Sequence, residues 1–189
     1  MKKIAIFASG SGSNAENIIR FFENDARNQV VGVFCNKPDA YVLVRAERLG
    51  VPAFVFGRDD FYRTNAVSDK LKALGVDLIV LAGFLWKVPD DILADFPNRV
   101  INIHPALLPK FGGKGMYGER VHRAVIAAGE KESGITVHYV NGRYDDGAAI
   151  FRAVCPVAPD DTPETLAAKV HALEYAHFPQ VIKEVADNL

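Results

Sequence analysis

Residues 2–22 read KKIAIFASGSGSNAENIIRFF and set out a strand, a glycine-rich loop and a helix in that order. The apolar run at 4–8 is short and has no polar face, which is typical of a buried strand in a parallel sheet. Ser13-Asn-Ala-Glu16 fits the capping box that opens many helices. A loop between such a strand and helix lies at the carboxyl end of the strand, where α/β proteins bind ligands. This opening predicts an α/β fold with a ligand site at residues 9–14.

The alternation of strands and helices continues over the first hundred residues. Asp39 is expected to cap the second helix and Gly50 to end it. Such alternation builds right-handed βαβ units and a parallel sheet with helices on both faces. Further strands are expected at residues 30–35, 53–56, 78–82 and 100–103, and further helices at about 39–50, 60–74 and 89–94.

The second half of the chain is less regular. A helix is expected at 118–128, with strands at 135–140 and 148–157. The connection between those strands is too short for a crossover helix, so it predicts an antiparallel pair. Thr162-Pro163 opens the last helix as its cap and first residue, and Pro179 is expected to kink or end it. The whole pattern predicts a single-domain Rossmann-like sandwich with a mostly parallel sheet.

Composition excludes several classes of protein. Of the 189 residues, 49% are hydrophobic and 24% charged, which is typical of a globular enzyme. The 22 Lys and Arg against 23 Asp and Glu give a net charge of −1, so no overall field attracts nucleic acid or a membrane. Cys35 and Cys155 match no zinc spacing and are expected to be buried thiols. We expect no metal, because the sequence contains no metal-ligand spacing. We expect a cytoplasmic location, because the first apolar run is too short for a signal peptide.

The glycine-rich loop predicts an anion site. Its small residues let the backbone approach an anion, and the following helix offers unpaired N–H groups. Gly10, Gly12 and Ala15 also fit a loose dinucleotide pattern, but the acidic residue expected after the second strand is replaced by Asn36. A terminal monophosphate therefore fits better than a pyrophosphate. The alternative is that Ser13 only caps the helix and the glycines only form a turn.

Three polar residues in the second half form a candidate catalytic group. Asn102 and His104 are two apart at a strand end, so they share one face. One can donate a hydrogen bond to a developing oxyanion and the other can transfer a proton near neutral pH. Asp145 beside His104 would raise the imidazole pKa and fix its tautomer. The alternatives are a structural histidine and a solvated turn carboxylate, since spacing alone does not bring 145 beside 104.

Five segments, in order along nearly the whole chain, resemble the phosphoribosylglycinamide formyltransferases. They are IAIFASGSGSN, DLIVLAGFLWKVP, NRVINIHPALLPK, GITVHYVNGRYDDGAAI and ETLAAKVHALEYAHFPQVI. The motif NIHPALLP is shared with a wider superfamily of formyltetrahydrofolate-dependent enzymes, so it does not indicate which molecule accepts the formyl group. That part of the resemblance rests on the glycine-rich loop and the last helix. The resemblance implies formyl transfer from 10-formyltetrahydrofolate to glycinamide ribonucleotide, in de novo purine biosynthesis. It also implies one formyltransferase domain over 1–189, with a mononucleotide-binding half at about 1–100 and a catalytic, folate-binding half at about 101–189.

The resemblance also implies a role for each matching residue. Asn102, His104 and Asp145 match the catalytic residues, and Gly12, Ser13 and Asn14 match the phosphate-binding loop. Glu174 matches the contact to the glycinamide end of the substrate; from its place beside the apolar stripe of the last helix, a packing salt bridge is the alternative. The residues that match the folate site are Arg58, Leu85, Trp86, Lys87, Val88, Asn102, Asn141, Gly142, Arg143, Tyr144 and Asp145.

The sequence departs from this family at the glycine-rich segment 111–118, which is longer than expected and is interpreted as a flap. Three alternative functions stay open. A formyl-folate hydrolase would carry a regulatory domain, and a methionyl-tRNA formyltransferase would carry a further domain with positive charge for RNA; we expect this chain to have neither. A non-catalytic nucleotide-binding module would use only the glycine-rich loop. The expected partners are the two small-molecule substrates, without nucleic acid or membrane, and the protein is expected to be a monomer or homodimer.

Overall fold

The computed structural model describes residues 1–189, and its strands form one seven-stranded sheet in the order β3-β2-β1-β4-β5-β6-β7. The strands are β1 (Lys2–Ala8), β2 (Asn28–Cys35), β3 (Ala53–Val55), β4 (Leu78–Leu81), β5 (Val100–His104), β6 (Glu132–Tyr139) and β7 (Ala149–Pro156). The helices are α1 (Ser13–Phe22), α2 (Tyr41–Arg48), α3 (Arg58–Tyr62), α4 (Ala66–Ala73), α5 (Asp90–Asp95), α6 (Glu119–Ala127) and α7 (Pro163–Asp187). The chain divides into a first part, residues 1–101 and 182–189, and a second part, residues 102–181.

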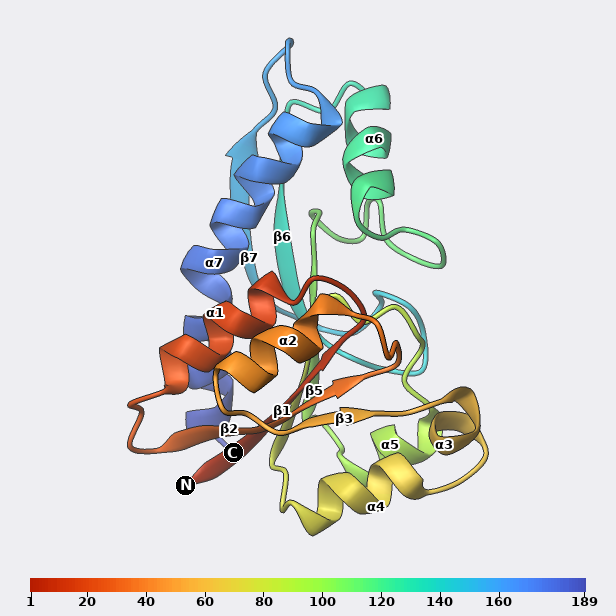
Figure 1. The fold of residues 1–189 in the computed structure, drawn as a ribbon. Helices are drawn as coiled ribbons and strands as arrows, with labels where there is room; N and C mark the ends of the chain where they lie inside the picture. The colour runs from red at the N-terminus through yellow and green to blue at the C-terminus, as the bar shows by residue number, and fades with distance from the viewer. The chain divides into compact units, whose positions relative to one another are not determined.

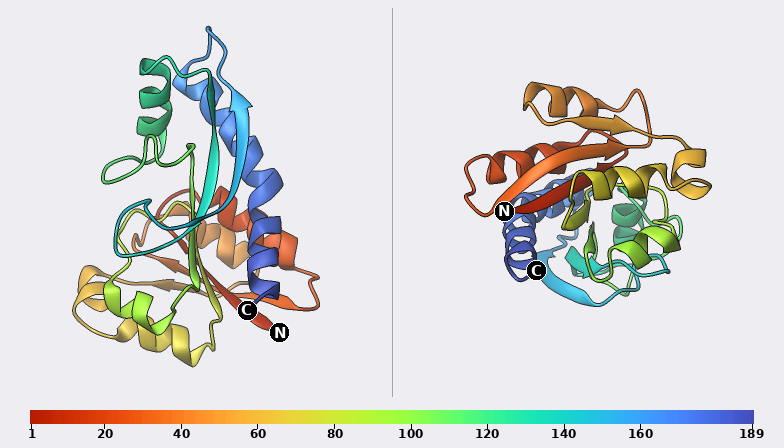
Figure 2. Two further views of the ribbon diagram at one scale, coloured as in Figure 1. Left: turned by 180° about the vertical axis from the view of Figure 1, so that it is seen from behind. Right: turned by 90° about the horizontal axis from the view of Figure 1, so that it is seen from below.

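The first part contains the predicted parallel sheet. Strand β1 pairs in parallel with β2 and β4, and β2 pairs in parallel with β3. Helices α1 and α2 cover one face, while α4 and α5 cover the other (Figure 1). All five residues at 4–8 are buried, because both faces of the central strand are covered. The two chain ends lie side by side (Figure 2), and Lys2 Nζ donates to the carbonyl of Leu189.

The second part contains the predicted antiparallel pair. Strands β6 and β7 form a hairpin in which Ser133 lies opposite Cys155. Helix α7 runs along one side of this hairpin and α6 lies on the other (Figures 1 and 2). The ring of Phe151 on β7 contacts that of His177 on α7. The expected fold class, α/β with a mostly parallel sheet and an antiparallel pair in the C-terminal half, is confirmed.

Two expected helix caps are wrong. Gly12, not Ser13, is the N-cap of α1, and no side chain caps the helix. Gly12 has φ of 76°, a left-handed conformation that glycine adopts without strain, and Ser13 is thereby moved into the first turn. Helix α2 begins at Tyr41 with Ala40 as its N-cap, so Asp39 lies outside it. Thr162 does cap α7, since its Oγ1 accepts from the N–H of Thr165.

The extents of two helices were not settled by the sequence. The helix expected over 60–74 is two helices, α3 and α4, because Thr64 Oγ1 accepts from the N–H of Ala66 and forms a local turn between them. Of the two effects expected of Pro179, a kink or the end of the helix, the end does not occur, because helix α7 continues through Pro179 to Asp187. Proline removes one helical hydrogen bond, and burial of the neighbours Phe178 and Val181 offsets that loss. Cys35 and Cys155 are free and buried, as expected. No helix has the length and apolar character needed to cross a membrane.

Candidate active site

Strand β5 ends at the two residues that define the site in the second part. Asn102 and His104 lie two positions apart, so they face the same side of the strand. His104 is only 3% exposed. An almost fully buried imidazole at the carboxyl end of a strand needs polar partners, and these come from segments distant in the sequence.

His138 on β6 holds the amide of Asn102. The amide nitrogen of Asn102 lies 3.0 Å from His138 Nε2, and His138 Nδ1 lies 2.9 Å from the carbonyl oxygen of Tyr139. A carbonyl can only accept, so Nδ1 carries a proton and, in the neutral ring, Nε2 accepts from the amide N–H of Asn102. This fixes which way the Asn102 amide points and leaves its second N–H for another acceptor.

Sequence reasoning missed His138. The residue is 2% exposed, and only the tertiary structure places it beside Asn102. One signal could have found it: Thr136 and His138 alternate on one face of a strand that runs directly into the turn carrying Asp145. The hydroxyl of Thr136 on this same face donates to the carbonyl of Ala106 and accepts from the N–H of Leu108, anchoring the segment after β5.

Asp145 completes the group. Its Oδ2 lies 3.5 Å from His104 Nδ1, and its Oδ1 lies 3.7 Å from His138 Nε2. The turn that carries it packs closely on the end of β6, because a Cβ on Gly147 would lie 1.7 Å from the carbonyl oxygen of Tyr139. Asn102, His104, His138 and Asp145 therefore form one connected cluster from three segments of the chain.

Burial and charge set the protonation of this cluster. Burial opposes the charged form of Asp145, but the neighbouring imidazoles of His138 and His104 and the Gly113 N–H outweigh it, and the pKa of the carboxyl lies below its ordinary value. Burial also lowers the pKa of His104, and the opposing effects of Asp145 and of the hydrogen bond to the Phe111 carbonyl do not cancel it. The cluster thus combines an anionic carboxylate with an imidazole that can take up or release a proton below its usual pH range.

The glycine-rich loop lies in the first part, directly after β1. Gly12 fits closely against α2, since a Cβ there would lie 2.3 Å from Val42 Cγ2. Arg45 Nε donates to the carbonyl of Ser11, and the Arg45 guanidinium also pairs with Glu16. The side chains of Ser13 and Asn14 follow at the start of α1. A fixed loop at a helix N-terminus is suited to binding an anion.

The residues matched to the folate site fall in both parts. In the first part, the guanidinium of Arg58 lies 4.9 Å from the centre of the Trp86 ring, and Tyr62 Oη donates to the carbonyl of Lys87. Leu85 is exposed, whereas Val88 is buried. In the second part, Asn141 Oδ1 accepts from the N–H of Arg143, and the turn formed there exposes Gly142 and Tyr144.

Glu174 lies on α7 in the second part and is 6% exposed. A buried carboxylate needs a hydrogen-bonding or charged partner, and this need agrees with the predicted contact to an ammonium group as well as with a salt bridge. No group of three or more His, Cys, Asp or Glu side chains is arranged to hold a metal ion.

The chain belongs to the formyl transferase family, whose model matches residues 2–182. Within that family it is similar to the phosphoribosylglycinamide formyltransferase of Haemophilus influenzae, at 40% identity over 97% of this chain and 86% of that protein. It is 38% identical to the chloroplastic phosphoribosylglycinamide formyltransferase of Arabidopsis thaliana, over 99% of this chain but only 66% of that protein. The crystal structure of glycinamide ribonucleotide transformylase 1 from Symbiobacterium toebii matches with a TM-score of 0.90 and 36% identity, over 100% of this chain and 89% of that one.

Proposed function

We propose that this protein transfers the formyl group of 10-formyltetrahydrofolate to the amine of glycinamide ribonucleotide. The products are formylglycinamide ribonucleotide and tetrahydrofolate, and the step belongs to de novo purine (IMP) biosynthesis. The observation that carries the proposal is the cluster of Asn102, His104 and Asp145, in which an amide, an imidazole and a carboxylate meet. The similarity to phosphoribosylglycinamide formyltransferases over nearly the whole chain supports the choice of donor and acceptor.

The reaction needs stabilisation of a negatively charged oxygen. The amine attacks the formyl carbon, and charge develops on the formyl oxygen. The second amide N–H of Asn102 donates to that oxygen, and one such donor typically contributes about 3 kcal/mol. The positive charge of the His104 imidazolium stabilises the same oxygen electrostatically. His138 orients the Asn102 amide before the substrates bind, so little reorganisation remains during the reaction.

The reaction also moves one proton. The bond between the formyl carbon and the folate nitrogen breaks, and the proton lost by the attacking amine ends on that nitrogen. Asp145, ionised at neutral pH, stabilises the imidazolium of His104 and assists this transfer. Binding both substrates together contributes by proximity, up to about 7–11 kcal/mol in well-oriented reactions.

The remaining residues are proposed to bind the substrates. Gly12, Ser13 and Asn14 hold the phosphate of the ribonucleotide, and Glu174 contacts its glycinamide end. The folate is held by Arg58, residues 85–88 and the turn at 141–145. The reaction needs no metal ion in this proposal, and the two reduced thiols fit a cytoplasmic location.

A direct assay tests the function. Protein, 10-formyl-folate and glycinamide ribonucleotide are mixed, and the folate absorbance is followed with and without the ribonucleotide. Loss of the formyl donor only in the presence of the ribonucleotide is expected. Loss at an equal rate without it would instead identify a hydrolase, and no loss in either case would favour a non-catalytic nucleotide-binding module.

A further inference from the structure

The backbone of residues 111–113, which we call the clip, lies directly on His104 and Asp145. We propose that the clip is a positioning element: the Phe111 carbonyl keeps a proton on His104 Nε2 and the Gly113 N–H holds the carboxylate of Asp145, so that His104 Nδ1 faces Asp145. Its relevance to catalysis rests on the proposed function, in which His104 and Asp145 act together.

Two backbone contacts carry this inference. The carbonyl oxygen of Phe111 lies 2.7 Å from His104 Nε2, and the N–H of Gly113 donates to Asp145 Oδ2 over 3.0 Å. A carbonyl can only accept, so Nε2 must carry the proton, and Nδ1 is left 3.5 Å from Asp145 Oδ2. The clip thus offers an acceptor to the imidazole and a donor to the carboxylate.

Close packing accounts for the glycine at position 112 of the clip. A Cβ on Gly112 would lie 2.5 Å from Leu108 Cδ2 and 3.3 Å from the Cβ of Asp145. Phe111 has φ of 56°, which turns the chain so that its carbonyl reaches the imidazole. A side chain at 112 would push the clip away from Asp145, whereas a Cβ on Gly115, beyond the clip, would meet nothing within 4 Å.

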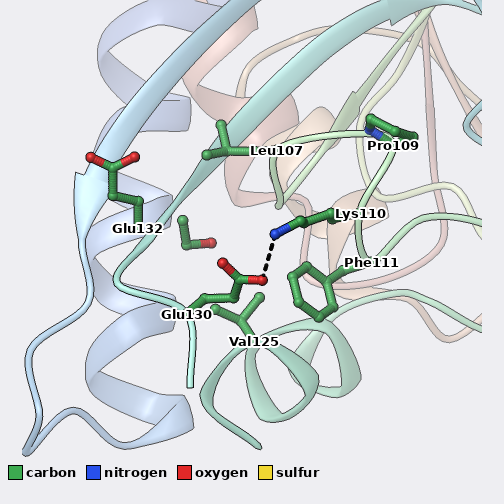
Figure 3. Close-up of a pocket in the computed structure, with 8 residues that line it drawn as sticks. Leu107, Pro109, Lys110, Phe111, Val125, Glu130 and Glu132 are labelled. Atoms are coloured by element: carbon green, nitrogen blue, oxygen red, sulfur yellow. Dashed lines mark hydrogen bonds and ion pairs between the residues drawn. The ribbon is translucent and has the colours of Figure 1, made fainter. Parts of the chain in front are cut away.

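The outer side of the clip borders a cavity of about 330 Å³ (Figure 3). Phe111 lines this cavity together with Leu107, Pro109 and Val125. At its edge Lys110 Nζ lies 2.8 Å from Glu130 Oε1, and the two side chains point toward one another beside the Phe111 ring. The clip therefore contacts His104 and Asp145, while its Phe111 side chain lines this cavity together with the Lys110–Glu130 ion pair.

The charged and titratable groups that face His104 decide what loss of the clip would do. Asp145 and the Phe111 carbonyl favour the imidazolium, whereas burial and the nearby His138 and His122 disfavour it. Without the Phe111 carbonyl, the pKa of His104 should fall further and the neutral ring should no longer be restricted to the Nε2–H tautomer.

Nitrogen NMR of ¹⁵N-histidine-labelled protein without substrates tests the clip, with the His104 signals assigned from the His104→Ala spectrum. In the unsubstituted protein, neutral His104 should carry its proton on Nε2. Gly112→Ala should lower the His104 titration midpoint, add the Nδ1–H tautomer and reduce kcat about 10- to 100-fold, the range expected for a misplaced catalytic group. Gly115 also has a left-handed backbone conformation, but a Cβ there would meet no other atom. Gly115→Ala should therefore leave the His104 titration midpoint, the His104 tautomer and kcat unchanged.

Neutral His104 with its proton on Nδ1 in the unsubstituted protein would overturn the proposal, whether or not Gly112→Ala folds. So would a folded Gly112→Ala variant with an unchanged midpoint and tautomer. The NMR result does not depend on turnover. If the spectra are as expected but the protein transfers no formyl group, the proposed function is refuted and the proposed role of the clip is not.

Discussion

The glycine-rich loop and the second-part cluster differ in how the chain builds them. The loop is made from consecutive residues between β1 and α1, so its shape follows from local backbone preferences and from contact with α2. The cluster joins β5, β6 and the turn that follows β6, together with the clip, so no member is positioned by its sequence neighbours alone. Binding of a simple anion can rely on local structure, whereas an arrangement that moves a proton needs groups from several elements held at fixed distances.

The largest effects should come from the two β5 residues. Asn102→Ala and His104→Ala should each reduce kcat/KM at least about 100-fold, because the first removes a hydrogen-bond donor to the developing oxyanion and the second removes the imidazolium charge that stabilises it. Steady-state kinetics measures this, and circular dichroism checks that the variants fold. Asn188→Ala, at the exposed end of the chain, is the matched control for the amide and should keep normal turnover. Near-normal turnover of either β5 variant would show that the substituted residue is not part of the catalytic group.

Asp145→Asn should lower kcat about 100-fold, the lower end of the usual contribution of general acid–base groups. A neutral amide occupies the same space but cannot stabilise the imidazolium of His104. Because the carboxylate favours the charged ring, the NMR titration midpoint of His104 should also fall in this variant. Wild-type turnover of this variant, with an unchanged His104 titration midpoint, would show that Asp145 has only a structural role.

Substitutions in the glycine-rich loop should change the KM for the ribonucleotide and the free energy of unfolding, but not kcat. Gly12→Ala adds both left-handed backbone strain and a clash with Val42, whereas Gly50→Ala adds only the strain. Gly50→Ala should reduce the free energy of unfolding by about 1–2 kcal/mol, and Gly12→Ala by about 1–3 kcal/mol more. Urea unfolding measures both. The KM for the ribonucleotide should rise only in Gly12→Ala; equal effects of the two substitutions would mean that contact with α2 does not shape the loop.

The smallest effect concerns pH. Burial lowers the pKa values of His104 and His122 from the ordinary 6.5, so the unfolded chain binds protons that the folded protein does not. The free energy of unfolding should therefore fall as the pH drops below about 6.5. His122→Leu should make this decrease shallower without changing the active-site residues, as urea unfolding at pH 7.5 and 5.5 would reveal. If the free energy of unfolding decreases equally between pH 7.5 and 5.5 in both proteins, His122 does not contribute to the pH dependence of stability.

The sequence by itself determined the fold class and most strand positions, and it singled out Asn102, His104 and Asp145 as the candidate catalytic group. These follow from short-range properties: apolar runs, period-two alternation and the strand-loop-helix order around residues 9–14. It misplaced the caps at Ser13 and Asp39, since those depend on packing that outweighs local preference.

Only the tertiary structure decided that Asp145 lies beside His104, that His138 holds Asn102, and that the 111–113 backbone contacts the pair. Hydrogen bonds act over about 3 Å, and the sequence separations between these residues carry no information about such distances. The folding of β5 and β6 into adjacent strands brings them within reach, and burial there sets their pKa values.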